Sequence, residues 1–448
     1  MLIHILKIIK NNLRANLLLV AGIFVIATSL WYAVDYVYAV AVNGQKSLGF
    51  EWENVYYIQV GVLPQESLER DTTTRSPEMM TGEYLEFCNR LKRHPAVKDL
   101  CYTRMHFHYV WKNGTQTVFY DTLQAGAYTR MVSPGYFSVF GVKGADGCSP
   151  EELSKRARPE EMVMTDNLAR YLISGKGSKE YTPRKGVEMV GKLVSFNKDG
   201  SDSVRVSAVC ENQKYNEYTL HKLRVSLVDA VCENQKYNEY TSQQAALYYV
   251  RNDGFKCTYA SIPYQDLFIR VKADADRPGF VEAFRKEMKK QLRVGNLYLA
   301  DMRPMSEFRN EQLSDYRSEL YTYLAIAGFF LINAFLAVLG TFWFRTQHRR
   351  EELAIRITSG ATPHSLMRLL MGEGILLVTF AYISALIVAY NLGVADLVNT
   401  WPVEWSLGRF IVGGILTYFL LLVVVVFSIW FPARQAMKIQ PAEALHGE

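Results

Sequence analysis

Residues 15–34 read ANLLLVAGIFVIATSLWYAV, an apolar stretch with no charged side chain before Asp35. A helix needs about 20 mostly apolar residues to cross a hydrocarbon core, so this stretch is long enough to do so. A cleavable signal peptide is the alternative, but its apolar region is usually shorter, and no small-residue cleavage site stands out after this one. We therefore expect a retained membrane anchor.

Three further apolar stretches lie close together towards the C-terminus, at 321–344, 369–392 and 409–431. Each is long enough to span a membrane as a helix. The long segment 42–320 separates them from the first stretch and is much more polar. This spacing predicts a four-span helical bundle, one span plus three, with a large domain between spans one and two.

Basic residues predict the orientation, because short loops rich in Lys and Arg stay in the cytoplasm. Such residues precede span one, fill the loop between spans two and three, and follow span four: Lys7, Lys10, Arg14, Arg345, Arg349, Arg350, Arg356, Arg368, Arg434 and Lys438. Both termini should therefore be cytoplasmic and the large domain periplasmic, in a bacterial inner membrane. The same topology accounts for the net charge of +6 without nucleic-acid binding.

These expectations divide the chain into consecutive parts. They are a cytoplasmic N-terminal segment (1–14), span one (15–41), a periplasmic α/β domain (42–320), span two (321–344), a cytoplasmic loop (345–368), span three (369–392), a short periplasmic loop (393–408), span four (409–431) and a cytoplasmic tail (432–448).

The segment 42–320 has mixed helical and strand patterns, which predict an α/β domain. Asn113-Gly114 suits a type I′ turn, so we expect a hairpin over His106–Tyr120. Elsewhere we expect helices at Glu83–Arg93, Asp166–Ile173 and Pro278–Leu292, and strands at Met162–Thr165, Gly191–Phe196 and Asp266–Val271.

A verbatim duplication interrupts this domain: the sequence AVCENQKYNEYT occupies Ala208–Thr219 and again Ala230–Thr241. Two copies do not make a solenoid, because repeat architectures need at least three stacked units. Only one copy can occupy a given strand register, so we expect the other to be an inserted hairpin or loop.

The sequence offers no convincing metal or catalytic site. His106 and His108 share one face of a predicted strand but lack a third ligand with suitable spacing, so we favour an exposed pair. All six cysteines lie in 42–320, where an oxidising compartment permits disulfides; Cys88 with Cys101 is one possible pair, and buried free thiols are the alternative. No GxxxxGK[ST] phosphate loop is present, so we expect no ATP hydrolysis, cofactor or metal on this chain.

The loop between spans two and three has ordered helix signals. Residues 349–356 predict a short amphipathic helix, with Glu352 and Arg356 at the favourable i,i+4 spacing. Gly360 is placed to end this helix, Thr362 to cap the next one, and Pro363 to occupy its first position. This helix-turn-helix could transmit force from a partner to two spans, whereas a simple topology anchor would not require such capping.

Glu373 lies just inside span three, where an unpaired charge is costly. We weigh two interpretations equally: a packing partner such as a loop arginine, or a coupling contact.

Residues in this loop and in the tail resemble permease subunits of ABC systems of the FtsX and MacB type. Glu352-Leu-Ala-Ile-Arg356, Ser359-Gly-Ala-Thr362 and Leu369-Leu-Met-Gly-Glu373 look like the family's coupling segment. Phe431-Pro-Ala-Arg434 and Ile439-Gln-Pro-Ala-Glu-Ala-Leu445 are similar to its C-terminal signature.

The large domain carries a second part of the resemblance. Val132–Gly141 and Met164–Ala169 look like the MacB-like periplasmic core. The duplication departs from the family, which has one such strand. MacB carries its ATPase on the same chain, whereas here only six residues precede Lys7, so we expect the ATPase to be a separate protein.

The resemblance implies a non-catalytic permease that forms a homo- or heterodimer and recruits a cytoplasmic ABC ATPase, which binds the ATP. It implies mechanotransmission, in which the ATPase moves the periplasmic domains, for export or efflux with a possible periplasmic adaptor. Lipoprotein release and FtsX-like signalling to an envelope partner, such as a cell-wall hydrolase, stay open as alternatives. The coupling role would fall on Glu352, Arg356, Gly360, Ala361, Thr362 and Glu373.

Overall fold

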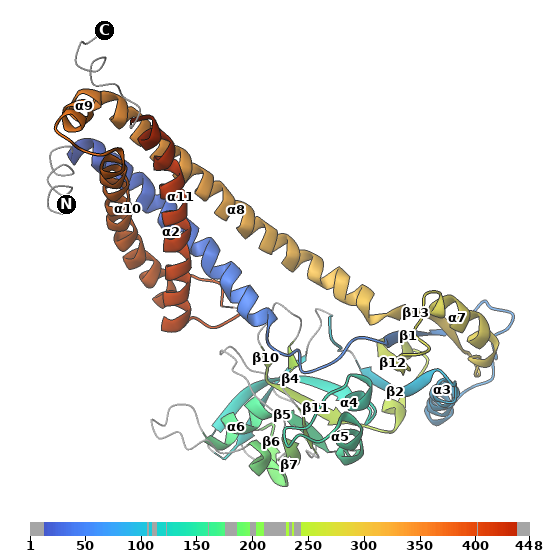
Figure 1. The fold of residues 1–448 in the computed structure, drawn as a ribbon. Helices are drawn as coiled ribbons and strands as arrows, with labels where there is room; N and C mark the ends of the chain where they lie inside the picture. Colours follow the sequence, from blue (N-terminus) through green and yellow to red (C-terminus); the bar gives the residue numbers. More distant parts are fainter. Residues whose placement is uncertain are drawn as a thin grey trace. The chain divides into compact units, whose positions relative to one another are not determined.

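The computed structural model describes residues 13–104, 107–109, 114–121, 123–159, 161–174, 186–197, 203–209, 230–232, 235–236, 243–400 and 402–436. The chain forms two compact units (Figure 1). We call Met1–Gln45 with Asp315–Glu448 the helical unit, and Lys46–Ser314 the α/β unit.

The long helices confirm the predicted fold class. Among the residues that the structure describes, four helices are long and apolar enough to cross a membrane. They are α2 (Leu13–Gly44), α8 (Met305–His348), α10 (Pro363–Val394) and α11 (Leu407–Ala436), and the short helix α9 (Arg350–Thr358) follows α8.

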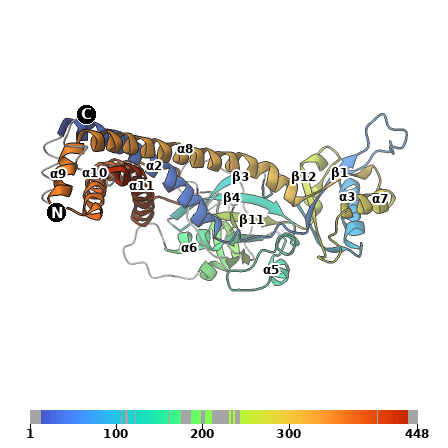
Figure 2. The same cartoon turned by 45° about the horizontal axis from the view of Figure 1, so that its top comes forward.

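Helix α8 extends well beyond the predicted span 321–344. Its 44 residues correspond to about 66 Å, roughly twice the thickness of a hydrocarbon core. An apolar window detects only the part that suits lipid, because the first turns of α8 are polar and include Glu307 and Glu311. Figures 1 and 2 draw α8 as one unbroken helix that belongs to both units.

Small residues let α2, α10 and α11 pack closely in the helical unit. Ala27 of α2 and Ala381 and Ala385 of α10 are fully or almost fully buried in its core. Small side chains allow helix backbones to approach each other in a membrane, where van der Waals packing drives association. Gly374 of α10 shows the same constraint, because a Cβ there would clash with Ile429 of α11.

An ion pair is buried where α2 meets α11. The Arg409 Nη2 and Nε atoms lie 2.5 and 3.0 Å from the two carboxylate oxygens of Asp35, and both side chains are 2% exposed. Arg409 also donates to the carbonyl of Asn399 at 2.9 Å. Buried charges within a membrane are usually paired in this way. The pair therefore holds the loop before α11 against α2.

The α/β unit contains one large sheet with the strand order β11-β5-β8-β7-β6-β3-β4-β2-β12-β1-β13. Additional pairings of β11 with β4 and β5 with β7 close β4, β3, β6, β7, β5 and β11 into a ring. The strands are β1 (Val55–Val62), β2 (Val97–Arg104), β3 (Gly114–Tyr120), β4 (Leu123–Val132), β5 (Met162–Thr165), β6 (Lys192–Ser195), β7 (Ser203–Val209), β8 (Ala230–Cys232), β11 (Ala246–Val250), β12 (Gln265–Val271) and β13 (Leu297–Pro304), and the separate pair β9 (Gln235–Lys236) and β10 (Gln243–Gln244).

Two cores correspond to the ring and to the remaining four strands. The helices α3 (Pro77–Lys92) and α7 (Phe280–Gln291) supply Phe87 and Phe284 to the second core, where Leu267 of β12 is also buried. Three shorter helices lie beside the strands of the ring (Figure 1): α4 (Tyr136–Val139), α5 (Pro150–Arg156) and α6 (Asp166–Ser174). The elements predicted at 83–93, 162–173, 191–196, 266–271 and 278–292 are thereby confirmed.

Only part of the predicted hairpin over His106–Tyr120 lies within the described residues. Strand β3 begins at Gly114 as expected, but it pairs with β4, with Tyr120 opposite Leu123. Asp121 adopts φ 52° in that connection, a left-handed conformation that Asp tolerates better than most residues. Residues 110–113 lie outside the described residues, and His108 lies in a turn instead of a strand.

His108 is buried in the ring core, which corrects the expectation of an exposed histidine pair. Its ring stacks on Phe50 with 3.5 Å between centroids, and its Nε2 lies 2.9 Å from the Tyr136 hydroxyl and 3.1 Å from Arg130 Nη1. Burial, assisted by the positive charge of Arg130, lowers the pKa of His108 well below its usual value. His106 lies outside the described residues.

The cysteines Cys88, Cys101, Cys148 and Cys257 are buried free thiols. The Cys88–Cys101 disulfide is therefore wrong, and the alternative is confirmed for these four residues. Burial raises the pKa of the Cys88 thiol far above its usual range, which makes it unreactive. Of the two copies of the duplication, the described residues include only the end of β7, β8 at Ala230–Cys232 and β9 at Gln235–Lys236, and the rest lies outside them. The expectation that one copy is a hairpin or loop therefore stays a prediction.

The low pKa of His108 predicts that acidification destabilises the fold. An unfolded histidine has a pKa of about 6.5, so below that pH the unfolded chain binds a proton that the folded chain rejects. Stability should be unaffected above pH 7 and should fall by up to about 1.4 kcal/mol per pH unit between pH 6.5 and the lower folded pKa. Thermal unfolding of the detergent-solubilised chain between pH 7.5 and 5 measures this slope. His108→Gln should flatten it by one proton, and an unchanged slope in that variant contradicts the assignment.

Candidate coupling site

Helix α9 ends at the predicted glycine. Gly360 has φ 92°, a left-handed conformation that favours glycine after a helix. The turn is closed by the Ala361 N–H, which donates to the Arg356 carbonyl at 2.9 Å. The start of α10 is also confirmed, because the Thr362 hydroxyl accepts from the Ser365 N–H at 3.3 Å and Pro363 occupies the first turn.

The two faces of α9 differ in what they contact. Leu353 and Ala354 are 3% and 0% exposed, and Leu353 packs in the core of the helical unit. Ile355 on the other face is 53% exposed, although it is apolar. One face of α9 is therefore fixed to the bundle and the other is available to a partner.

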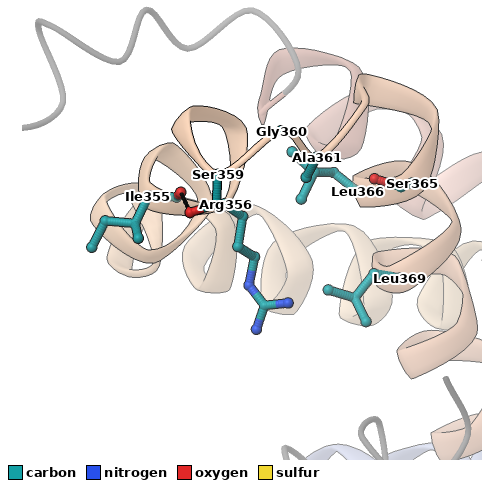
Figure 3. A pocket seen from close by; sticks show the side chains of 8 residues that line it. All are labelled: Ile355, Arg356, Ser359, Gly360, Ala361, Ser365, Leu366 and Leu369. Carbon is teal, nitrogen blue, oxygen red and sulfur yellow. Dashed lines mark hydrogen bonds between the residues drawn. The ribbon is translucent and has the colours of Figure 1, made fainter.

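The exposed face borders a shallow, open hollow of about 520 Å³ between α9 and the first turns of α10 (Figure 3). Its floor and walls mix apolar side chains with one guanidinium and two hydroxyls. The lining residues are Ile355, Arg356, Ser359, Gly360, Ala361, Ser365, Leu366 and Leu369.

A chain of alternating charges starts at this hollow. Arg356 Nη2 lies 2.7 Å from Glu352 Oε1, the predicted i,i+4 pair, and Arg349 Nε lies 2.9 Å from Glu352 Oε2. Partial burial alone would raise the pKa of Glu352, but the hydrogen bonds from Arg349 and Arg356 outweigh it and lower that pKa. Glu352 is therefore ionised at neutral pH and bridges both arginines.

The chain continues to a buried carboxylate. Glu373 of α10 is 1% exposed, and its two oxygens lie 2.8 Å from Arg345 Nη1 and 3.2 Å from Arg349 Nη1. Arg345 also donates to the side-chain oxygen of Asn16 on α2. Hydrogen bonds to ionised groups are roughly twice as strong as neutral ones, so Glu373 joins α2, α8, α9 and α10 at one point.

The predicted site residues take different places around this point. Arg356, Gly360 and Ala361 line the hollow, Glu352 supports Arg356, and Thr362 caps α10. Glu373 is not among the lining residues, and its ion pairs with Arg345 and Arg349 confirm its interpretation as the partner of a loop arginine.

Sequence reasoning missed the specific roles of three residues, Asn16, Arg345 and Arg349. The two arginines were assigned only to membrane topology, although their i,i+4 spacing at the end of span two places them on one helix face. Within the described ranges, no group of three or more His, Cys, Asp or Glu side chains is arranged to hold a metal ion.

Because Glu373 is buried, replacing its carboxylate with a neutral group should strongly lower the stability of the fold. Glu373→Gln leaves Arg345 and Arg349 without their shared carboxylate, and breaking a buried ion pair costs on the order of 3–5 kcal/mol. Glu352→Gln is the matched control, because its side chain is 42% exposed and such pairs contribute about 0–1 kcal/mol. Thermal unfolding in detergent measures the stability of both variants. Equal losses of stability in the two variants contradict the claim that the ion pairs of Glu373 hold the helices together.

Three solved structures have some likeness to this chain. A domain of a candidate permease from Porphyromonas gingivalis has 14% identity and a TM-score of 0.31, and covers 56% of this chain and 90% of its own. The periplasmic region of MacB from Actinobacillus actinomycetemcomitans has 10% identity and a TM-score of 0.30, with 59% and 95% covered. The extracellular domain of the ABC-type transporter YknZ from Gram-positive bacteria has 14% identity and a TM-score of 0.28, with 55% and 100% covered.

No curated protein matches this chain. The family model for the FtsX-like permease C-terminal domain matches residues 324–441, a range that holds most of α8 with α9, α10 and α11. The residues quoted from the cytoplasmic loop and the first of the two tail motifs lie in this range. By this match, residues 324–441 form an FtsX-like permease C-terminal domain.

Proposed function

We propose that this chain is the permease subunit of an ABC-type mechanotransmission system and that the hollow beside α9 docks a separate cytoplasmic ATPase. The hollow offers an apolar rim with Ile355 exposed, next to the guanidinium of Arg356. An exposed apolar side chain beside a charged group is typical of a protein interface. The ordered turn through Gly360 gives this surface a fixed shape.

The charge chain supports this proposal most directly. A force applied to α9 reaches Glu373 through Glu352 and Arg349, and from there reaches α8 and α2 through Arg345. The contacts of Glu373 are buried, whereas Glu352 is partly exposed, so the charged link between α9 and the long helices rests mainly on the Arg349–Glu373 pair. A force applied at the hollow then moves the helix bundle together with α9.

Helix α8 is the element that carries movement onward. In the α/β unit its first turns are anchored by Met305, which is buried in the ring core, and by Phe308, which packs against that core. In the helical unit, Ala334 and Phe342 of the same helix are 0% and 1% exposed. A continuous helix fixed in both cores transmits displacement along its axis.

We also propose the membrane topology that the distribution of Lys and Arg residues predicts. Both termini and α9 lie in the cytoplasm, the α/β unit lies outside the inner membrane, and two permease chains assemble with the ATPase. We propose that the resulting movement exports a periplasmic substrate with the help of an adaptor. FtsX-like signalling to a cell-wall hydrolase, or lipoprotein release, predicts wall or lipoprotein defects without loss of efflux when the gene is deleted.

The docking proposal predicts that a negative charge on the rim of the hollow weakens binding of the ATPase to this chain. Ile355→Asp places a carboxylate on the apolar rim, so the amount of ATP-binding subunit that copurifies with the full chain from its native membrane should fall at least tenfold. The associated ATP hydrolysis should fall with it. Both are measured on the affinity-purified complex.

Thr358→Asp provides the matched control, since Thr358 is an exposed residue of the same helix outside the hollow. It should retain the ATPase, and both variants should keep the melting temperature of the parent chain. Retention of the ATPase by Ile355→Asp, or its equal loss from both variants, contradicts docking at this hollow.

A further inference from the structure

Among the described helices that could span a membrane, α8 is the least buried. In its most apolar stretch 11% of the residues are buried, against 28% to 33% in α2, α10 and α11. Its buried side is narrow and includes Ala327, Ala334 and Val338, which pack in the core of the helical unit. The rest of its surface is therefore left to lipid or to a helix of another chain.

A regular stripe of residues runs along the exposed side of α8. Its members are alternately three and four positions apart, which is the spacing of the a and d positions in two helices that pack side by side. Phe329, Leu336 and Gly340 each follow a buried residue by two positions, about 200° around the helix, so the stripe faces away from the bundle. The stripe consists of Ile326, Phe329, Asn333, Leu336 and Gly340.

The stripe contains one amide at a depth where lipid offers it no partner. Asn333 lies at the middle of the apolar segment 321–344, about 18 Å of helix from either end. Its Nδ2 atom donates to the Phe329 carbonyl of the same helix at 2.8 Å. Among the residues that the structure describes, this side chain forms no second hydrogen bond, which leaves one N–H and the Oδ1 acceptor to be satisfied. Polar side chains within a membrane commonly form such bonds across helices.

A second copy of the same helix can satisfy both groups. All copies of a chain insert into a membrane in one orientation, so two α8 helices that meet through this stripe are parallel and bring Asn333 to the same depth. An amide both donates and accepts, so each Asn333 can donate its remaining N–H to the Oδ1 atom of the other across a twofold axis. The stripe carries no charge that would repel its copy. At Gly340 an added Cβ would meet nothing within 4 Å, and such a small residue lets two helix backbones approach closely.

We propose that α8 pairs with α8 of a second copy through this stripe, and that hydrogen bonds between the two Asn333 amides set the register of the pair. Asn333 is at an a position of the stripe, and a single Asn at such a position specifies register in parallel coiled coils. The inference rests on the assembly of two permease chains in the proposed function, and it names the surface through which they assemble.

Cysteine cross-linking of the full-length chain in its native membrane tests the surface. Leu336→Cys places a thiol on the stripe. Phe380→Cys on α10 is the matched control, because Leu336 and Phe380 are 57% and 50% exposed and both lie in the middle part of a span. Under mild oxidation, Leu336→Cys should form disulfide-linked dimers at least tenfold faster than Phe380→Cys. Equal rates, or faster linking of Phe380→Cys, overturn the α8 surface.

Single-molecule photobleaching of the fluorescently tagged parent chain separates this proposal from the proposed function. Two bleaching steps per complex, as expected, support the assembly of two chains. One step per complex contradicts that assembly itself. Two steps together with equal cross-linking of the two cysteine variants contradict only the pairing through α8.

Asn333→Leu tests the amide pair. Leucine is close to asparagine in size and keeps the stripe apolar, but it neither donates nor accepts a hydrogen bond. The dissociation constant of the dimer in lipid should therefore rise about 3- to 30-fold, the range expected for an interhelical hydrogen bond. Asn391→Leu is the matched control, because Asn391 Nδ2 makes the same bond within α10, to the Ile387 carbonyl at 2.7 Å. It should leave the constant unchanged. No rise for Asn333→Leu, or equal rises in both variants, overturns the role of Asn333.

Discussion

The arrangement of the helical unit depends on the cost of burying the Glu373 carboxylate. A charge inside a membrane protein must be paired, and this one takes guanidinium groups from Arg345 and Arg349. Each arginine lies on a different side of the break between α8 and α9, one within α8 and one at the start of α9. The carboxylate therefore fixes the angle at which the chain leaves α8, and with it the position of the hollow.

A second buried pair gives α2 a fixed point at its other end. Asn16 contacts Arg345, whereas Asp35 is paired with Arg409. Asp35 follows Asn16 by nineteen positions in the helix, a rise of about 28 Å. This length is close to the thickness of a hydrocarbon core, so both polar contacts lie near a membrane surface. The long helices are therefore joined by charge at their ends and by small apolar residues between them, which makes the bundle suited to moving as one body.

Local features of this fold could be predicted from the sequence, and distant pairings could not. The spans, the turn at Gly360 and the cap at Thr362 follow from residues adjacent in the chain. The choice of Arg345 and Arg349 as partners of Glu373 depends on how α8 packs against α10. The burial of His108 and the closure of the ring by β11 and β4 likewise join residues far apart in sequence, for which one sequence carries no signal.

The central claim is that Arg349 links α9 to the long helices, and a distance measurement in the assembled complex tests it most directly. Spin labels at the exposed positions 68 and 358 report the separation of the α/β unit from α9. In the complex with its ATPase in lipid, ATP should shift this distance in the parent chain. Arg349→Gln should reduce the shift while ATP hydrolysis continues, because the Glu373–Arg345 pair and the packing of Leu353 remain and only the charged link to α9 is cut. An undiminished shift in Arg349→Gln contradicts the account.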